Sequence, residues 1–220
     1  MRYRVCILML SVLAIGAPIP VLGQSSTPPQ VRAALVSPLV RVSARADSRL
    51  WLEGSSNVRD WTCKATEMAA SFDLIPVKPG RAPAEARAVR GVTVKVPVRM
   101  LKCGDRHMEA NLYKALKSPK PPAESFITAE FERLPGASVG SGTVEITGRL
   151  TIAGVERSVK MSVLSDRLPD GTYRARGTVP ILMTDFGITP PRPWGGILKT
   201  KDKVLIQFEV FVGFPTTSQP

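Results

Sequence analysis

Hydrophobic and polar residues alternate along several stretches of the chain, a period of two that is typical of strands with one buried face. In residues 92–100 the alternate positions are apolar, and they are Val92, Val94, Val96, Val98 and Met100. The same alternation runs through residues 143–152, 159–163 and 204–212, and residues 172–182 form a further expected strand. The pattern predicts a protein made mostly of β-strands.

Short turns separate these strands. Residues 153–156 (Ala-Gly-Val-Glu) and 169–171 (Pro-Asp-Gly) have the composition of tight turns, which join antiparallel neighbours in a meander. About eight strands are expected, and periodicity alone leaves both a sandwich and a closed up-and-down barrel open. Many inward positions carry Val, Thr or Gly, which favours a barrel with a cavity over a filled one.

One short helix is predicted after Asp105, whose carboxylate suits an N-cap. Met108, Leu112 and Leu116 recur at helical spacing on one face, and Ser118-Pro119 is expected to end the helix. The helix therefore interrupts an otherwise all-β chain.

The N-terminus has the features of a secretory signal peptide. Arg2 and Arg4 precede an apolar run over residues 5–15, which is too short to span a bilayer. Val21 and Gly23 fit the small-residue rule for cleavage after Gly23, so residues 1–23 are expected to be removed; an uncleaved membrane anchor is the alternative. Residues 24–38 are expected to be a flexible leader, and residues 39–215 the folded domain. The expected location is periplasmic or secreted.

Two cysteines remain after cleavage, because Cys6 lies in the signal segment. In an oxidising compartment Cys63 and Cys103 are expected to form a disulfide. A metal site is the competing interpretation, but His107 is the only histidine in the chain and no further Cys or His completes a tetrahedral zinc site. We therefore expect a disulfide and no metal.

The chain carries a formal charge of +12, most of which survives cleavage. Such a balance indicates an acidic partner such as nucleic acid, anionic lipid or an anionic polymer. Catalysis is not expected: His107 stands in a polar helix start, and Asp166 and Asp170 are expected to fall in a turn.

Four motifs, in order over residues 48–213, resemble the YceI-like family. They are Leu52–Cys63, then Met108-Glu109 with Tyr113–Lys117, then Gly148–Val155, and last Thr184–Pro191 followed by Asp202, Val204 and Ile206. The chain departs from the family's pattern at Glu109, where Asp is usual, at the cysteine two residues after Trp61, and in a lengthened connection over Pro76–Pro83.

The resemblance implies an extended, lipocalin-like antiparallel barrel, exported to the periplasm, whose lumen binds a long isoprenoid or a similar amphiphilic lipid. No cofactor is implied beyond such a lipid, and nucleic acid is no longer the expected partner. The candidate lipid-contacting residues fall in three places. The helix face at one end of the lumen contributes Met108, Leu112 and Leu116, and a loop at the other end contributes Phe186, Ile188 and Trp194. The candidates on the wall are Met100, Met161 and Phe208.

Two functions of different class follow. The first is an exported lipid carrier or sequestering protein, with Lys199, Lys201 and Lys203 as a basic rim facing an anionic membrane surface. The second is a non-catalytic envelope protein with a packed barrel, which binds an anionic partner or polymer through its basic face.

Overall fold

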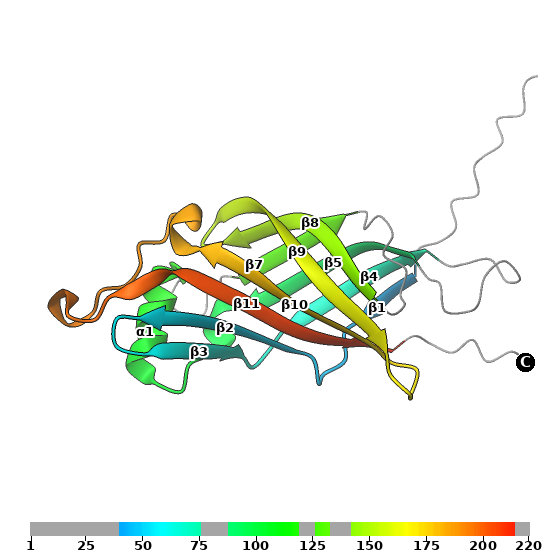
Figure 1. The fold of residues 1–220 in the computed structure, drawn as a ribbon, viewed down its shortest axis with the longest axis horizontal. Coiled ribbons are helices and arrows are strands. Elements are labelled where there is room, and N and C mark those ends of the chain that lie inside the picture. The colour runs from blue at the N-terminus through cyan, green and yellow to red at the C-terminus, as the bar shows by residue number, and fades with distance from the viewer. Residues whose placement is uncertain (1–39, 76–87, 119–125, 133–141, 214–220) are drawn as a thin grey trace, which may run out of the picture. The chain divides into compact units, whose positions relative to one another are not determined.

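The computed structural model describes residues 40–75, 88–118, 126–132 and 142–213, and the strands in these ranges form one antiparallel sheet (Figure 1). Across the sheet the order is β1-β4-β5-β7-β8-β9-β10-β11-β2-β3-β6. The predicted signal peptide, the leader and the Pro76–Pro83 connection lie outside the described residues. The strands are β1 (Val40–Ser43), β2 (Arg49–Ser56), β3 (Asp60–Ala65), β4 (Ala69–Ile75), β5 (Ala88–Pro97), β6 (Leu101–Lys102), β7 (Phe126–Glu132), β8 (Gly142–Ile152), β9 (Val155–Arg167), β10 (Tyr173–Leu182) and β11 (Thr200–Val212).

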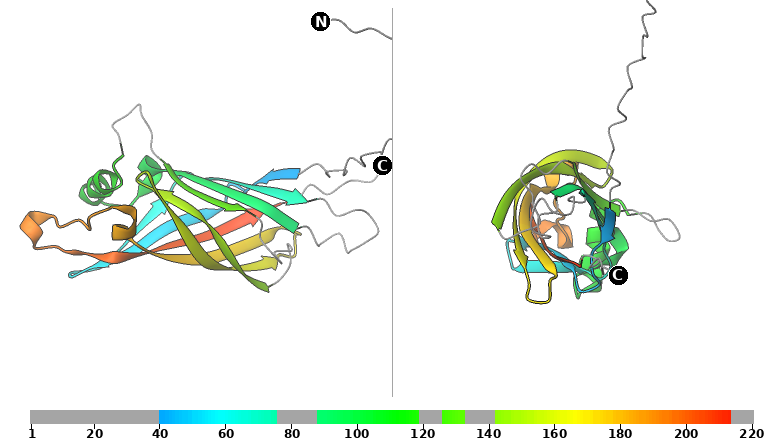
Figure 2. Two further views of the ribbon diagram at one scale, coloured as in Figure 1. Left: turned by 90° about the horizontal axis from the view of Figure 1, so that it is seen from above. Right: turned by 90° about the vertical axis from the view of Figure 1, so that its right-hand side faces the viewer.

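The sheet closes on itself because three long, interrupted strands each contribute one half to either end of the strand order. The two halves of each interrupted strand follow one another in the chain, as β1 and β2, β3 and β4, and β5 and β6. One half of the middle strand, β3, is hydrogen-bonded to β2 and β6, and the other half, β4, is hydrogen-bonded to β1 and β5. Between the halves, the backbone and side chain of Thr66 donate to the Met100 carbonyl at 2.8 and 3.0 Å. Seen end on, the strands form a ring (Figure 2). The predicted antiparallel β class is confirmed, and eleven segments replace the expected eight strands because of these three interruptions.

The predicted turns join the expected neighbours. β8 and β9 pair from Gly142 with Ser165 to Ile152 with Val155, and the turn between them has positive φ at Ala153 (51°) and Gly154 (81°). These two angles are those of a type I′ turn, whose twist matches that of the strands it joins. The β9–β10 turn is closed by Asp170, which accepts from the Thr172 backbone N–H at 2.9 Å. Local sequence was therefore sufficient to predict these connections.

The expected strand over residues 92–100 was partly wrong. β5 ends at Pro97, and residues Val98–Met100 form a 3-10 turn before β6. Proline has no N–H to donate to a ladder, so regular pairing is interrupted where it stands. The turn also places Met100 off the lumen wall, in neither of the two cavities described below.

The helix α1 (Arg106–Ala115) begins where the sequence predicts but ends at Ala115, before the expected stop at Ser118-Pro119, because the backbone leaves the helical region at Lys117 (φ 53°). Asp105 accepts from the Met108 backbone N–H at 2.8 Å, as an N-cap does. Leu116 follows the last helical residue and is buried, while Met108 and Leu112 are partly buried against the barrel core. Within the described ranges, α1 included, no helix combines the length and apolarity that crossing a bilayer requires.

Charged side chains on the outer face tie four neighbouring strands together. Asp166 of β9 accepts from Arg174 of β10 at 2.7 Å, and Arg176 lies 3.5 Å from the same carboxylate. Glu209 of β11 lies 3.9 Å from Arg174 and pairs with Arg49 of β2. The outer surface is thus polar and the inner surface apolar, as the alternation predicts.

Candidate functional site

The barrel encloses an apolar cavity, which we call the lumen cavity. The space open to the centres of water-sized spheres is about 180 Å³. Alternate residues of the strands line it, for example Val159, Met161 and Val163 on β9, and Ile206, Phe208, Val210 and Val212 on β11. The period of two in the sequence therefore places one face of each strand on the cavity wall.

The wall of the lumen cavity carries no charge among the described residues. Among the lining residues that the structure describes, the side-chain polar groups are the hydroxyls of Ser165 and Tyr173. An ion placed there would lose its hydration without gaining a partner, whereas an alkyl or isoprenoid chain would lose only contact with water. The chemistry of the wall therefore suits a long apolar ligand and excludes a charged one.

Three glycines face aromatic rings inside the barrel. The ring of Phe131 lies across Gly148, that of Phe208 across Gly177 and that of Trp61 across Gly54, so closely that a Cβ at each glycine would overlap ring atoms. Gly177 and Phe208, and Gly54 and Trp61, are direct cross-strand partners. Because the glycines leave this space, the rings of Phe131 and Phe208, which line the lumen cavity, lie against the sheet rather than across the lumen.

Buried core residues gather at the end of the barrel near α1, and we call them the packed layer. Seven buried residues of the main core cluster contact neither cavity, and they come from the end of the barrel that α1 covers. They are Val98, Leu101, Leu116, Ile152, Phe186, Ile188 and Val204.

A second cavity of about 170 Å³, the helix-side cavity, lies between α1, the β2–β3 hairpin and residues 191–200. Its apolar lining includes Trp61, Met108, Leu112, Met183 and Leu198. Its polar lining includes Arg59, Asp105, His107 and Asn111. This cavity therefore differs from the lumen in having charged groups.

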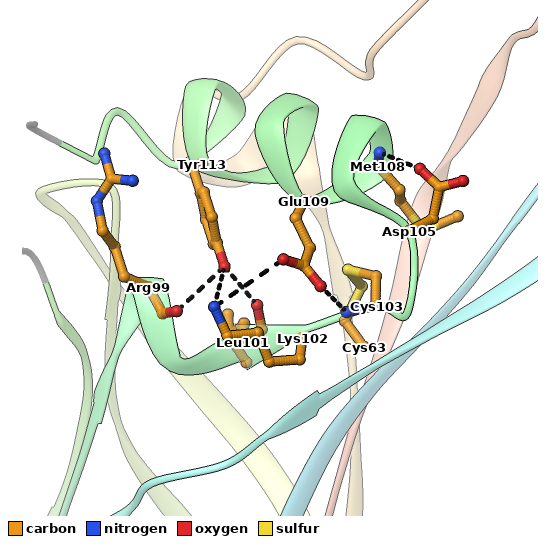
Figure 3. Close-up of a disulfide and its surroundings, with 9 residues drawn as sticks. All are labelled: Cys63, Arg99, Leu101, Lys102, Cys103, Asp105, Met108, Glu109 and Tyr113. Atoms are coloured by element: carbon orange, nitrogen blue, oxygen red, sulfur yellow. Dashed lines mark hydrogen bonds and ion pairs between the residues drawn. A yellow bond between two sulfur atoms is a disulfide. The ribbon is translucent and has the colours of Figure 1, made fainter.

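The predicted disulfide joins β3 to the chain just before α1. Cys63 is bonded to Cys103, and the Cys103 backbone N–H donates to Glu109 at 3.0 Å (Figure 3). The Tyr113 hydroxyl lies 2.9 Å from the carbonyl oxygen of Leu101 and 3.1 Å from that of Arg99. Figure 3 shows the side chains of Glu109 and Tyr113 reaching from α1 to the segment 99–103. The helix is held on the barrel by one covalent bond and these polar contacts.

Electrostatics at the start of the helix stabilise an ionised Asp105. The backbone N–H of Met108 lowers the pKa of this carboxyl, and the nearby charges of His107 and Arg59 act in the same direction. The cap is therefore charged at neutral pH. The described part of the chain contains no cluster of three or more His, Cys, Asp or Glu side chains able to hold a metal.

The structure places seven of the nine candidate lipid-contacting residues in three groups, and Met100 and Trp194 belong to none of them. Met161 and Phe208 line the lumen cavity, while Met108 and Leu112 line the helix-side cavity. Leu116, Phe186 and Ile188 belong to the packed layer, and Met100 lies in the 3-10 turn. The side chain of Trp194 lies outside the described residues.

The placement of the helix and the 184–194 loop at opposite ends was wrong. Residues from both connections line the helix-side cavity, for example Met108 and Leu112 with Pro191 and Pro193. In a meander the chain returns to the same end after every second strand. The β6–β7 and β10–β11 connections are four strands apart, so they meet at one end.

Several lumen residues were not predicted because they come from strands that the sequence analysis did not identify. Leu50 and Leu52 on β2, and Phe72 and Leu74 on β4, all line the cavity. Leu50 and Leu52 do alternate with Trp51 and Glu53, so a weak signal was present. Gly148 was a sequence signal for the position of Phe131, because a glycine within a strand often marks a site where another group lies close to the backbone.

Residues 48–212 match the model of a protein family, the YceI-like domain. The chain belongs to the YceI-like family. The match spans β2 to β11 and so includes both cavities and the disulfide. No protein of curated function matches the chain.

Two solved structures share the YceI-like fold with this chain. A polyisoprenoid binding domain from Saccharophagus degradans, implicated in plant cell wall breakdown, superposes with a TM-score of 0.59 at 14% identity and covers 81% of this chain and 100% of its own. BcnA from Burkholderia cenocepacia gives a TM-score of 0.55 at 20% identity, covering 76% of this chain and 98% of its own. At these identities the similarity shows the fold.

Proposed function

We propose that this YceI-like protein holds a long-chain isoprenoid or a similar amphiphilic lipid in its lumen cavity, for carriage or sequestration in the cell envelope. The observation that supports this most directly is the uncharged lumen wall, where Phe131 and Phe208 lie flat over glycines. The description of the Saccharophagus degradans relative as a polyisoprenoid binding domain supports the same ligand class.

The Cys63–Cys103 disulfide supports export. Structural disulfides persist in oxidising compartments and are rare in the cytosol. The proposed location is therefore the periplasm or the extracellular space, after cleavage near Gly23. The exposed Lys199, Lys201 and Lys203 are available to an anionic membrane surface, which we propose as the source or destination of the lipid.

The alternative, a packed barrel that acts only through its basic face, is favoured less because the lumen is not filled by side chains. Mass spectrometry of organic extracts from the natively purified protein tests the two. The first proposal expects a co-purifying lipid that is lost in Ala175→Phe, since Ala175 lines the lumen cavity and a larger side chain fills it.

Thr178→Phe provides a matched control, because Thr178 is exposed on the same strand. The thermal stability of both variants is measured together with their lipid content, so that loss of lipid caused by unfolding is distinguished from loss caused by a filled cavity. A protein free of lipid when purified from its own source, or equal lipid in both variants, would contradict lipid binding in the lumen.

A further inference from the structure

Two loops that are far apart in the sequence meet at the end of the barrel near α1. These are residues 56–60, the turn between β2 and β3, and residues 192–199 of the β10–β11 connection, which together we call the tip. The Asn57 side chain accepts from the Lys199 backbone N–H at 2.7 Å and donates to the Ile197 carbonyl at 3.0 Å. The Asn57 backbone N–H donates to the Lys199 carbonyl at 3.0 Å. One asparagine therefore fixes the two loops to each other.

The tip presents two large aliphatic side chains to solvent. Val58 is 67% exposed and Ile197 is 75% exposed, the highest values among the large hydrophobic residues of the described ranges. The β2–β3 turn that carries Val58 is held by Ser56, whose hydroxyl accepts from the Val58 and Arg59 backbone N–H groups at 3.2 and 3.0 Å. Val58 is therefore exposed on a turn that is held by hydrogen bonds. The side chains of Val58 and Ile197 both lie at this end of the barrel.

Positive charge accompanies these side chains. Arg59, Arg192 and Lys199 are exposed within the tip, against the single carboxylate of Asp60. Lys201 and Lys203 continue the positive charge along β11. Aliphatic side chains flanked by cations complement a bilayer surface that contains anionic lipids, where the headgroups attract the cations and the acyl boundary accepts the apolar groups.

The helix-side cavity lies directly behind the tip. Arg59 and Leu198 belong to the tip and also line that cavity, together with Trp61 and Met108. The cavity therefore combines apolar and charged lining residues directly behind the exposed aliphatic side chains. A stable protein interface would need about 800 Å² on each partner, which is far more than two aliphatic side chains provide.

We propose that the tip docks this protein on bilayers containing anionic lipids, with Val58 and Ile197 inserted at the headgroup level and Arg59, Arg192 and Lys199 paired with lipid phosphates. This inference deepens the proposed envelope function by naming the surface that meets the membrane, and it rests on that function. Asn57 is a positioning residue in it, because it holds the two aliphatic side chains at one end.

The test is flotation of the folded, signal-free protein with vesicles of phosphatidylcholine, with and without phosphatidylglycerol. We expect binding to the anionic vesicles that weakens with added salt, as screening requires. Val58→Asp and Ile197→Asp together are expected to reduce the bound fraction by roughly tenfold or more, because burial of each aliphatic side chain is lost. Asn57→Ala is expected to weaken binding by less.

Leu164→Asp is the matched control, because Leu164 is also exposed (41%) but lies on the outer face of β9, away from the tip. It is expected to bind as the wild type does. The proposal would be overturned if the tip variants bound vesicles as well as the wild type does, or if binding did not depend on phosphatidylglycerol and salt. It would also be overturned if the tip variants lost self-association but kept vesicle binding.

Lipid extracted from the same variants distinguishes this inference from the proposed function. The tip variants are expected to retain the lumen lipid and lose vesicle binding, whereas Ala175→Phe is expected to lose the lipid and keep vesicle binding. A wild type that floats with anionic vesicles yet carries no lipid would contradict the lumen proposal alone. One that carries lipid yet never floats would contradict the docking proposal alone.

Discussion

The ring of Phe131 on β7 lies across Gly148 on β8, in the space that any other residue at position 148 would fill with its Cβ. Both residues lie on the inner face, and Phe131 lines the lumen cavity. The openness of the lumen therefore depends on a residue that contributes no side chain.

Gly148→Ala is expected to push the Phe131 ring toward the lumen and destabilise the barrel by about 1–3 kcal/mol, the range of overpacked core substitutions. Chemical unfolding measures the loss, and lipid content measures the narrowing. Gly213→Ala is the control, because nothing lies within 4 Å of a Cβ built there. Equal stability and lipid content in the two variants would show that the ring yields without cost.

The Cys63–Cys103 bond closes a segment with a sequence separation of 40. Chain-entropy reasoning assigns such a closure about 4 kcal/mol, with native strain or residual denatured structure reducing the figure. Cys63→Ser with Cys103→Ser is expected to lower the free energy of unfolding by about 2–4 kcal/mol. Reduction of the wild type provides the control and should give the same loss, while an unchanged midpoint in both would contradict a stabilising role.

Tyr113→Phe removes the hydroxyl that lies within 3.1 Å of the Arg99 and Leu101 carbonyl oxygens. A lost hydrogen bond of this kind costs about 1 kcal/mol, and the two partner carbonyls lose a donor. We expect faster amide hydrogen exchange in α1 and little change in β9 and β10. Exchange that accelerates equally throughout the barrel would indicate global destabilisation instead of loosening of the helix.

Acid is expected to destabilise the fold through four carboxyls whose pKa values are lowered in the folded state. Hydrogen bonds from the Arg41 side chain to Asp73, from the Met108 backbone to Asp105, from the Arg174 side chain to Asp166 and from the Thr172 backbone to Asp170 are the main causes. A lowered pKa contributes stability that is complete above the unfolded value of about 3.9 and is lost as pH falls through the folded value.

The measurement is the free energy of unfolding from neutral pH to about pH 2. It is expected to be level above about pH 5 and to fall below about pH 4. Asp166→Asn should flatten part of the decline, since this carboxylate accepts from Arg174 at 2.7 Å in the wild type. Stability that stays level to pH 2 would contradict the assigned pKa directions.

Local patterns allowed much of this fold to be predicted. The alternation in residues 143–152 and 204–212 corresponds to β8 and β11, Asp105 caps α1, and residues 153–154 form the predicted turn. These features depend on residues a few positions apart, whose preferences act before any tertiary contact forms. The same alternation also indicated which face of each strand lines a cavity.

What depends on distant partners could not be obtained in this way. The interruption of three strands, the contact of Phe131 with Gly148 and the bonds of Asn57 to the 197–199 segment require residues from separate strands to be placed side by side. Whether the lumen is open is decided last, because it depends on the summed volumes of side chains from all of the barrel strands, and no single segment of the chain contains that information.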